Sequence, residues 1–204
     1  LCRGYSMETL SLQECLERIQ SDVAASSYQG LECLKYWFQD ARNLARAEAE
    51  AELYYVVVKV LLNYVRRQVV GLVKPVGRKS TFRIDGVVLL AQVVRLACRG
   101  VGGRRTGPPK LARIHRKLWE HADEVFRCEA VASRQQTVLS YYCRLVKELA
   151  ECANVGYLSE LRGDLFRRLL RQLLQIPAPD VQSSAWEAAT LLFRHLDSDP
   201  SSEI

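Results

Sequence analysis

Two valine-rich segments in the middle of the chain constrain its fold more than any other feature. β-Branched residues favour strands, and residues 54–60 include four valines. The polar residues decide against a strand, because they recur at spacings of seven, four and three residues, as one narrow stripe of a helix does. This stripe consists of Glu52, Lys59, Asn63 and Arg66.

The second segment, residues 87–99, follows the same rule, because its polar residues are confined to Gln92, Arg95 and Arg99. Both segments therefore predict helices that neighbouring helices enclose on most sides, as in the interior of a multi-helix fold. The residues predicted to lie in the core are Val57, Leu61, Leu89 and Val93.

The N-terminal part of the chain contains a helix start signal. Ser11 and Glu14 form a capping box ahead of apolar residues at helical spacing. This pattern predicts a helix that frays near residues 26–27. Gly30 then opens a second helical pattern.

No glycine or proline separates this second pattern from Leu53. Residues 31–73 are therefore expected to form either one long bent helix or two helices in a tight hairpin, and we favour two helices with a break between Arg46 and Glu50. The apolar spacing predicts further helices at residues 111–126, 135–153, 158–173 and 180–196. About eight helices without a convincing strand predict an all-α fold, either a stacked helical-repeat-like array or an irregular helical bundle.

The closing stretch of the chain carries a family resemblance. A proline turn precedes Val181, and small alanines and leucines follow at helical spacing: Ala185, Ala188, Leu191, Leu192 and Leu196. This stretch resembles a helix of HEAT or armadillo repeats, and the resemblance covers residues 157–196 when the leucine-rich helix before it is included. It implies a stacked helical array, although the rest of the chain shows no fixed period of about 40–47 residues.

Length and composition predict one globular unit. With 204 residues, 49% of them hydrophobic, the chain can bury one substantial core. We predict a single all-α domain over residues 1–196 and a flexible acidic tail over residues 197–204. Because the chain does not begin with methionine, we expect a fragment of a larger protein or a processed product. The most apolar run, residues 53–65, is shorter than the roughly 20 residues that span a bilayer, so we predict a soluble protein without a transmembrane segment.

The seven cysteines are an odd number and include no C-x-x-C pair. Most of them occupy positions where the helical pattern requires an apolar residue, as free buried cysteines do. A disulfide framework or a zinc site would instead show paired, closely spaced ligands. This usage predicts an intracellular protein of the reducing nucleus or cytoplasm.

The positive charge of the chain is concentrated in one segment. Between Arg66 and Lys117 there are fourteen lysines and arginines and a single acid, Asp85, although the net charge of the whole chain is only +6. This asymmetry predicts an acidic partner. It does not distinguish a nucleic acid from an acidic peptide or an anionic membrane, because all three present negative charge to a basic surface.

The strongest candidate site within this segment extends from Arg99 to Lys117. Lys110 and Arg113 lie at the start of a predicted helix, where a cation costs about 0.3–1 kcal/mol because the helix N-terminus is already partly positive. An anion docked against the free N–H groups would explain these residues. The alternative is a solvated loop whose charge only keeps the protein soluble. The predicted partner-binding residues are Arg78, Lys79, Arg83, Arg99, Arg104, Arg105, Lys110, Arg113, Arg116 and Lys117.

No catalytic or cofactor signature accompanies these charges. The three histidines stand beside no recognised nucleophile motif, and the glycines of residues 100–103 follow a helix rather than the strand that a dinucleotide site requires. His121, Glu124 and Cys128 share a helical face, as metal ligands could. We assign His121 instead to a charged flank of that helix and Cys128 to the interior. We therefore predict no metal, no cofactor and no enzymatic activity.

These observations predict a noncatalytic helical scaffold or adaptor domain that mediates protein–protein interaction and presents a basic face to an acidic surface or segment of its partner. The alternative is a DNA- or RNA-binding helical domain that contacts the phosphate backbone. Few aromatic residues lie in the basic segment, which disfavours base stacking. A third class, an enzyme or a regulator that contributes an arginine to a partner's active site, rests only on Arg104 and Arg105 in their loop.

Overall fold

The computed structural model describes residues 10–73, 84–99, 109–128, 131, 136–151, 164–176 and 179–197. These residues contain nine helices and no strand, so the predicted all-α fold is confirmed. The helices are α1 (Leu12–Gln20), α2 (Ala24–Trp37), α3 (Ala41–Ala49), α4 (Ala51–Val73), α5 (Asp85–Arg99), α6 (Pro109–Phe126), α8 (Gln136–Glu151), α10 (Asp164–Leu174) and α11 (Pro179–Asp197). None of the described helices combines the length and the apolar character that crossing a membrane requires.

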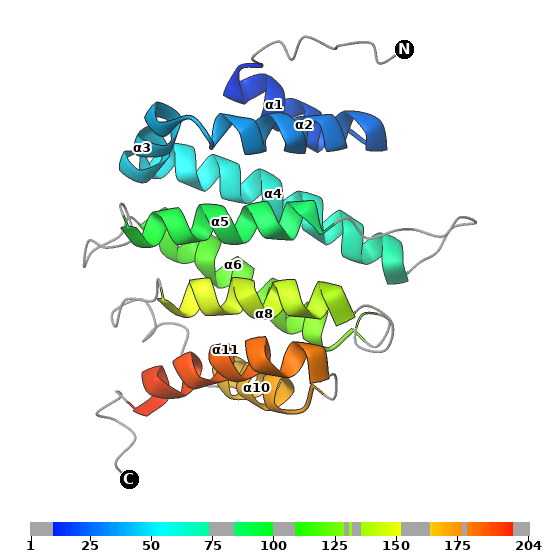
Figure 1. Cartoon of the computed structure of the whole chain (residues 1–204), viewed down its shortest axis with the longest axis vertical. Coiled ribbons are helices and arrows are strands. Elements are labelled where there is room, and N and C mark those ends of the chain that lie inside the picture. Colours follow the sequence, from blue (N-terminus) through cyan, green and yellow to red (C-terminus); the bar gives the residue numbers. More distant parts are fainter. Residues whose placement is uncertain are drawn as a thin grey trace.

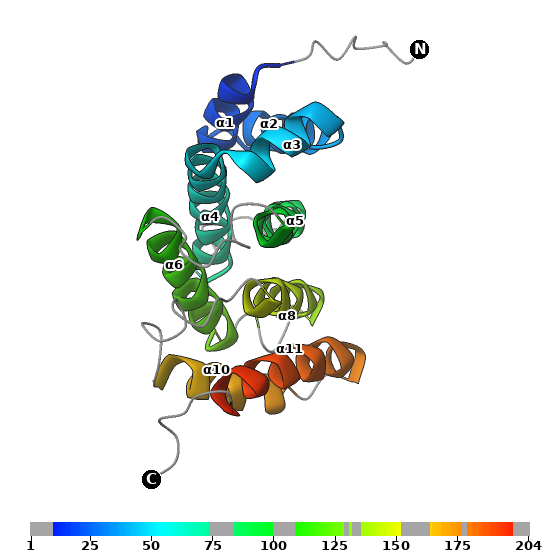
Figure 2. The same ribbon diagram turned by 90° about the vertical axis from the view of Figure 1, so that its left-hand side faces the viewer.

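The helices are stacked one above another along the long axis of the molecule (Figure 1). From the side they stand in two columns (Figure 2). The α6 column holds α1, α4, α6 and α10, and the α5 column holds α2, α3, α5, α8 and α11. Successive helices touch along each column, and pairs such as α4 and α5 touch across the columns. A stacked array is thus present, while a relationship to HEAT or armadillo repeats stays a prediction.

The first helical pair corrects the expected boundaries near the N-terminus. α1 begins at the predicted capping box, where Ser11 N–H donates to Glu14 Oε2 at 2.8 Å and Glu14 N–H donates to Ser11 Oγ at 3.3 Å. The helix ends at Gln20, however, and residues 26–27, where fraying was expected, lie inside α2.

Gly30 lies in the middle of α2 and does not open a helix, contrary to the sequence-based expectation. The two helices approach so closely here that a Cβ atom on Gly30 would lie 2.8 Å from both Cys15 O and Ile19 N of α1. Glycine is therefore required for packing, a role that the sequence pattern does not distinguish from that of a helix boundary.

Residues 31–73 contain parts of three helices. The favoured break between Arg46 and Glu50 is confirmed, because Glu50 separates α3 from α4. A further break between α2 and α3 was not predicted. Asp40 is the N-cap of α3, and its carboxylate accepts a hydrogen bond of 2.8 Å from Arg42 N–H.

α4 and α5 lie in the middle of the stack, as the valine-rich segments predict. The residues predicted for the core are at most 4% exposed: Val57, Leu61, Leu89 and Val93. Lys59 and Asn63 of the polar stripe are exposed. The predicted helices at residues 135–153 and 180–196 correspond to α8 and α11 within two residues at each end.

α6 packs against α4, α8 and α10, and buried polar groups connect it to the first two. Tyr54 Oη of α4 and His115 Nε2 of α6 are hydrogen-bonded at 2.6 Å. His121 Nε2 of α6 and Tyr142 Oη of α8 are hydrogen-bonded at 2.8 Å. All four side chains are buried. We refer to these two hydrogen bonds as the α6 polar ties.

α6 also has a polar contact with α10. Asp123 Oδ2 lies 2.9 Å from Arg127 Nη2 of the same helix and 3.5 Å from Arg168 Nη2 of α10. Beside this ion pair, the rings of Trp119 and Phe166 meet edge to face with centroids 5.0 Å apart. α6 is therefore held on three sides.

The assignment of His121 to a charged flank of its helix is wrong, because the side chain is only 1% exposed. The prediction placed His121 beside its neighbouring acids, and of these Glu124 is exposed and Glu120 is partly exposed. The ring of His121 instead faces α8, where Tyr142 satisfies Nε2. A buried histidine of this kind needs a partner from another helix, which sequence spacing alone does not identify.

Burial keeps both histidines of the ties neutral at pH 7. It lowers the pKa of His115 to about 4. Burial, together with the positive charge of Arg66, lowers the pKa of His121 to about 3. Burial also raises the pKa of Tyr54 and Tyr142. Each tie is therefore a hydrogen bond between two uncharged groups.

The close approach of α1 and α2 predicts that Gly30→Ala destabilises the protein. Alanine is better than glycine in a helix by about 1 kcal/mol, but the new Cβ atom would collide with the backbone of α1. We expect a net loss of about 1–2 kcal/mol in the free energy of unfolding, measured by denaturant titration. Gln29→Ala, at the preceding exposed position, is the control and should change stability by less than about 0.5 kcal/mol. A Gly30→Ala protein of equal or greater stability would contradict the packing.

The α6 polar ties predict a loss of stability in mild acid. An unfolded histidine binds a proton near pH 6.5, whereas the folded ones bind it only near pH 4 and pH 3. Below about pH 6.5 the unfolded state therefore holds more protons than the folded state. The free energy of unfolding then decreases as the pH is lowered, by up to ~1.4 kcal/mol per pH unit for each histidine. Denaturant titrations between about pH 7.5 and about pH 4.5 measure this slope.

The matched variant is Tyr54→Phe/His115→Leu, which replaces both members of one tie by apolar groups. In this pH range, unfolding of the variant should take up about one proton fewer than unfolding of the original protein. Its free energy of unfolding should therefore depend less steeply on pH. An identical slope in the two proteins would show that His115 does not stay neutral in the folded state.

Candidate functional site

The structure describes only part of the predicted basic site. Five of its residues lie outside the described residues: Arg78, Lys79, Arg83, Arg104 and Arg105. Arg99 ends α5 and Lys110 lies in the first turn of α6, but their side chains are outside the description. The remaining three are exposed on one face of α6: Arg113, Arg116 and Lys117.

Within this exposed face, Arg116 Nε donates a hydrogen bond of 3.1 Å to Glu120 Oε1 one turn later. Arg113 and Lys117 are four residues apart and therefore lie beside each other on the helix surface. α6, which carries this face, lies across the stack from α5 (Figure 2).

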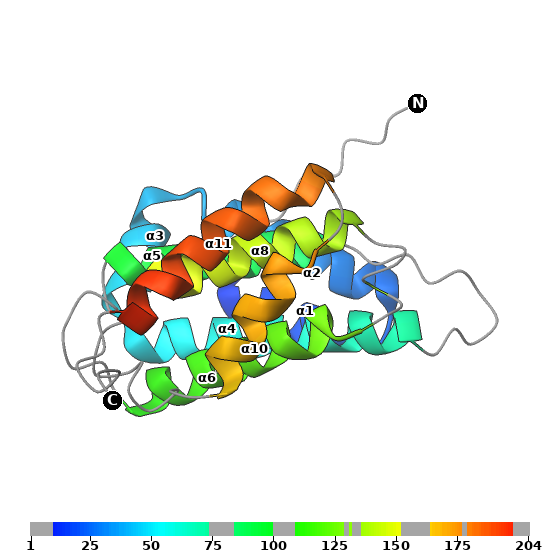
Figure 3. The same cartoon turned by 90° about the horizontal axis from the view of Figure 1, so that it is seen from below.

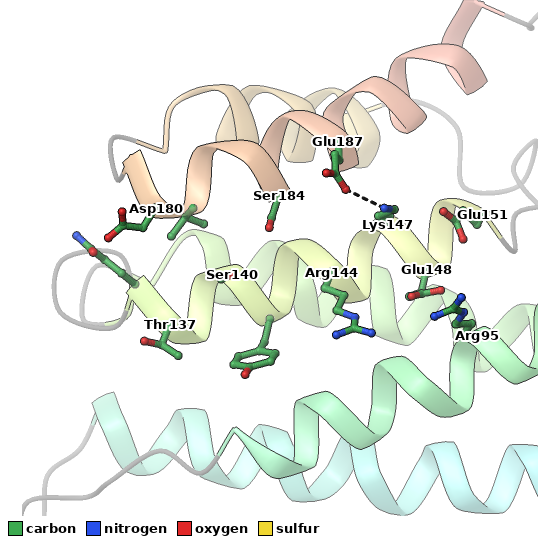
Figure 4. Close-up of a pocket in the computed structure, with 13 residues that line it drawn as sticks. Arg95, Thr137, Ser140, Arg144, Lys147, Glu148, Glu151, Asp180, Ser184 and Glu187 are labelled. Carbon is green, nitrogen blue, oxygen red and sulfur yellow. Dashed lines mark hydrogen bonds and ion pairs between the residues drawn. The ribbon is translucent and has the colours of Figure 1, made fainter.

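A groove is present on the other column, where α8 lies between α5 and α11 (Figure 4). Its volume is about 630 Å³. We call it the α8 groove. It is lined by Arg95 from α5, by Gln136, Thr137, Ser140, Tyr141, Arg144, Lys147, Glu148 and Glu151 from α8, and by Asp180, Val181, Ser184 and Glu187 from α11.

Helical periodicity gives the α8 groove its polar lining. Thr137, Ser140, Arg144, Lys147 and Glu151 are separated by three or four residues, so they share one face of α8. The opposite face carries the buried residues that pack on α6 and the rest of the core. The groove therefore forms where the solvated face of α8 meets polar residues of its two neighbours in the column.

An ion pair connects the two helices on one side of the groove. Lys147 Nζ of α8 donates a hydrogen bond of 2.8 Å to Glu187 Oε2 of α11. This hydrogen bond raises the pKa of Lys147. Because both side chains are partly exposed, the pair contributes no more than about 1 kcal/mol and serves mainly to position α11 beside α8.

Glu148 is the most buried of the ionisable groups in the α8 groove, at 5% exposure. Burial raises the pKa of its carboxyl group, and the charge of Glu151 raises it further, while Arg95, Arg144 and Lys147 lower it. The net shift is upward, so the ionised carboxylate is less favourable here than in water.

Arg95 and Arg144 bring two guanidinium groups from different helices to the same space. Both residues are exposed. Their side chains extend toward each other and toward Glu148 between α5 and α8 (Figure 4). Each guanidinium has five N–H donors, so one neighbouring carboxylate leaves donors available to a ligand. This arrangement can bind a carboxylate or a phosphate oxygen.

The charges of the whole groove limit what it can bind. The lining includes three basic residues and four acids: Arg95, Arg144 and Lys147, and Glu148, Glu151, Asp180 and Glu187. A ligand with one or two acidic groups fits this mixed lining. A polyphosphate backbone would meet repulsion from the acids along the groove.

The sequence contains the polar stripes of this groove but does not show that they meet. Arg95 interrupts an apolar run of α5 and Arg144 belongs to the polar stripe of α8, and the spacing indicates only that each is solvated. α5, α8 and α11 come together through packing between residues far apart in the chain. The predicted partner-binding residues of α6 lie in the other column. A high density of charge can be counted in a sequence, whereas a groove forms only when the helices pack.

Burial explains why the other candidate reactive groups, His121 and the cysteines, do not form a site. His121 Nδ1 lies 3.7 Å from Glu124 Oε2, and Cys128 is half-buried. In the described residues, no three of the His, Cys, Asp and Glu side chains are arranged to hold a metal ion. The described cysteines are free, and burial raises the pKa of the Cys15 thiol to about 11 and that of the Cys143 thiol to about 12, which keeps both unreactive.

Comparisons with protein-family models, with curated proteins and with solved structures found no match.

Proposed function

We propose that this chain is a noncatalytic helical scaffold that binds, in the α8 groove, an extended segment of another protein with one or two acidic residues. The observation that carries the proposal is the pair of exposed guanidinium groups of Arg95 and Arg144, which face one space from two helices. Arginine binds a carboxylate through parallel N–H donors, which favours an aspartate or glutamate side chain of the partner at this point.

The rest of the groove suits the backbone of an extended peptide. An extended chain has unpaired backbone N–H and C=O groups that need hydrogen-bond partners. Because helices offer no free backbone edge, side chains of the groove must supply these partners. Thr137, Ser140 and Ser184 supply hydroxyl groups along the groove, and each can donate and accept. Tyr141, half-buried beside them, offers an aromatic surface.

A nucleic-acid ligand is the alternative, and it would bind elsewhere. The four acids of the α8 groove disfavour a chain of phosphates there. The exposed stripe of Arg113 and Lys117 on α6 lies before the acids Glu120 and Glu124 of the same helix and would be the contact surface for DNA or RNA. The two functions therefore predict different surfaces.

The noncatalytic role is supported by the positions of the described histidines. His115 and His121 are buried and hydrogen-bonded to tyrosines, with their pKa values far below 7. A general base requires access to substrate and a pKa near the working pH. The free cysteines of the described residues support a place of action in the reducing nucleus or cytoplasm.

The proposal predicts a specific pattern of peptide binding. In a library of unstructured peptides in which each position in turn carries Glu, Asp, Gln or Lys, the purified protein should select Glu or Asp at one or two positions. Fluorescence anisotropy with a selected peptide measures the affinity. Arg95→Gln/Arg144→Gln should weaken binding at least about tenfold, since one charge-assisted hydrogen bond contributes about 1.5–3 kcal/mol.

Arg113→Gln/Lys117→Gln is the matched control, because it removes two exposed positive charges from the α6 column and leaves the groove intact. It should not change peptide affinity. If the protein selects no acidic position, or if both double variants weaken binding equally, the groove is not the acidic-segment site. High affinity for duplex DNA or RNA that falls only in the α6 variant would support the alternative.

A further inference from the structure

The last helical pair of the stack exposes large apolar side chains. Leu174 of α10 is 48% exposed, and Trp186 and Phe193 of α11 are 59% and 54% exposed. Figure 3 looks along the stack from this end, with α10 and α11 nearest to the viewer. Large apolar side chains that are exposed together on one surface mark a contact site.

The two aromatic residues lie on a different side of α11 from the one that pairs with Lys147 of α8. Glu187 faces α8, because it pairs with Lys147. At about 100° per residue, Trp186 and Phe193 lie roughly 100° and 120° around the helix from Glu187, in the same direction. They are therefore only about 20° apart and form one apolar line along α11.

α10 presents a matching line. Arg168 reaches Asp123 of α6, so that side of α10 faces up the stack. Arg167 and Leu174 lie roughly 100° and 120° around the helix from Arg168, again in the same direction, and Arg171 lies about 60° around. All three are exposed. We define the α10–α11 end face by Arg167, Arg171, Leu174, Trp186 and Phe193.

We propose that the α10–α11 end face docks an amphipathic helix of a partner protein that carries acidic residues beside its apolar stripe. The apolar residues of the face match a helix because the stack itself is built by laying helix upon helix, and a docked helix presents apolar residues at positions i, i+4 and i+7. The acidic flank follows from charge, since the exposed side of α10 carries Arg167 and Arg171 against one exposed acid, Asp164.

This surface is separate from the α8 groove. α11 contributes Asp180, Ser184 and Glu187 to the groove and Trp186 and Phe193 to the end face. The two surfaces therefore use different sides of one helix, and each can fail independently of the other.

Designed helical peptides test the proposal directly. One set carries leucine at i, i+4, i+7 and i+11 with glutamate on both flanks. A second set replaces the glutamates by lysine, and a third replaces the leucines by serine. Of the three tryptophans, Trp186 is exposed, Trp37 is partly buried and Trp119 is fully buried, so docking should shift the Trp186 emission to shorter wavelength and reduce its quenching by acrylamide. Only the leucine–glutamate set should produce these changes.

Two variants locate the binding surface. Leu174→Ser/Phe193→Ser keeps Trp186 as the reporter and should weaken binding of the leucine–glutamate set at least tenfold. Arg167→Glu/Arg171→Glu should lose that set and gain the lysine set, because the charge of the face is reversed. Arg95→Gln/Arg144→Gln, which disables the groove, should bind the leucine–glutamate set as the original protein does.

The proposal is overturned if the leucine–glutamate set causes no spectral change, or if the lysine set binds equally well. It is also overturned if sedimentation shows concentration-dependent self-association of the original protein that Leu174→Ser/Phe193→Ser abolishes. A second copy of the chain, and not a partner helix, would then cover the end face.

Discussion

The α6 polar ties are the constraint on which the arrangement of the stack depends. Apolar side chains favour contact between helices but tolerate many rotations of one helix against another. A phenol or an imidazole left without a partner in the interior costs about 1–3 kcal/mol. His115 and His121 therefore fix the rotation and the height of α6 against Tyr54 of α4 and Tyr142 of α8. α6 thereby sets the positions of the helices on either side of it.

The α8 groove is a consequence of this arrangement. Tyr142 turns one face of α8 toward α6, and Arg144, about 200° further round the helix, then faces α5 and solvent. α11 lies beside α8 and α5 lies on its other side, so the polar stripes of three helices meet. The same packing that buries neutral polar groups on one side of α8 thus presents charged groups on the other.

The sequence predicted the helices better than their partners. The valine-rich α4 and α5 were identified because their polar residues follow one helical stripe, and the break at Glu50 lies within the favoured range from Arg46 to Glu50. Gly30 and His121 were misinterpreted because their roles are set by other helices: Gly30 by the backbone of α1, and His121 by Tyr142. The groove was not predicted for the same reason, because Arg95 and Arg144 come together only in the folded chain.

Native-state hydrogen exchange tests the central role of α6 most directly. If the polar ties join α4, α6 and α8 into one cooperative unit, the slowest amides of all three helices should exchange with the same free energy of opening, equal to that of global unfolding. Tyr142→Phe should lower this value in all three together. Exchange of α6 at a markedly lower free energy than α4 and α8, or separate opening of the three helices, would contradict the account.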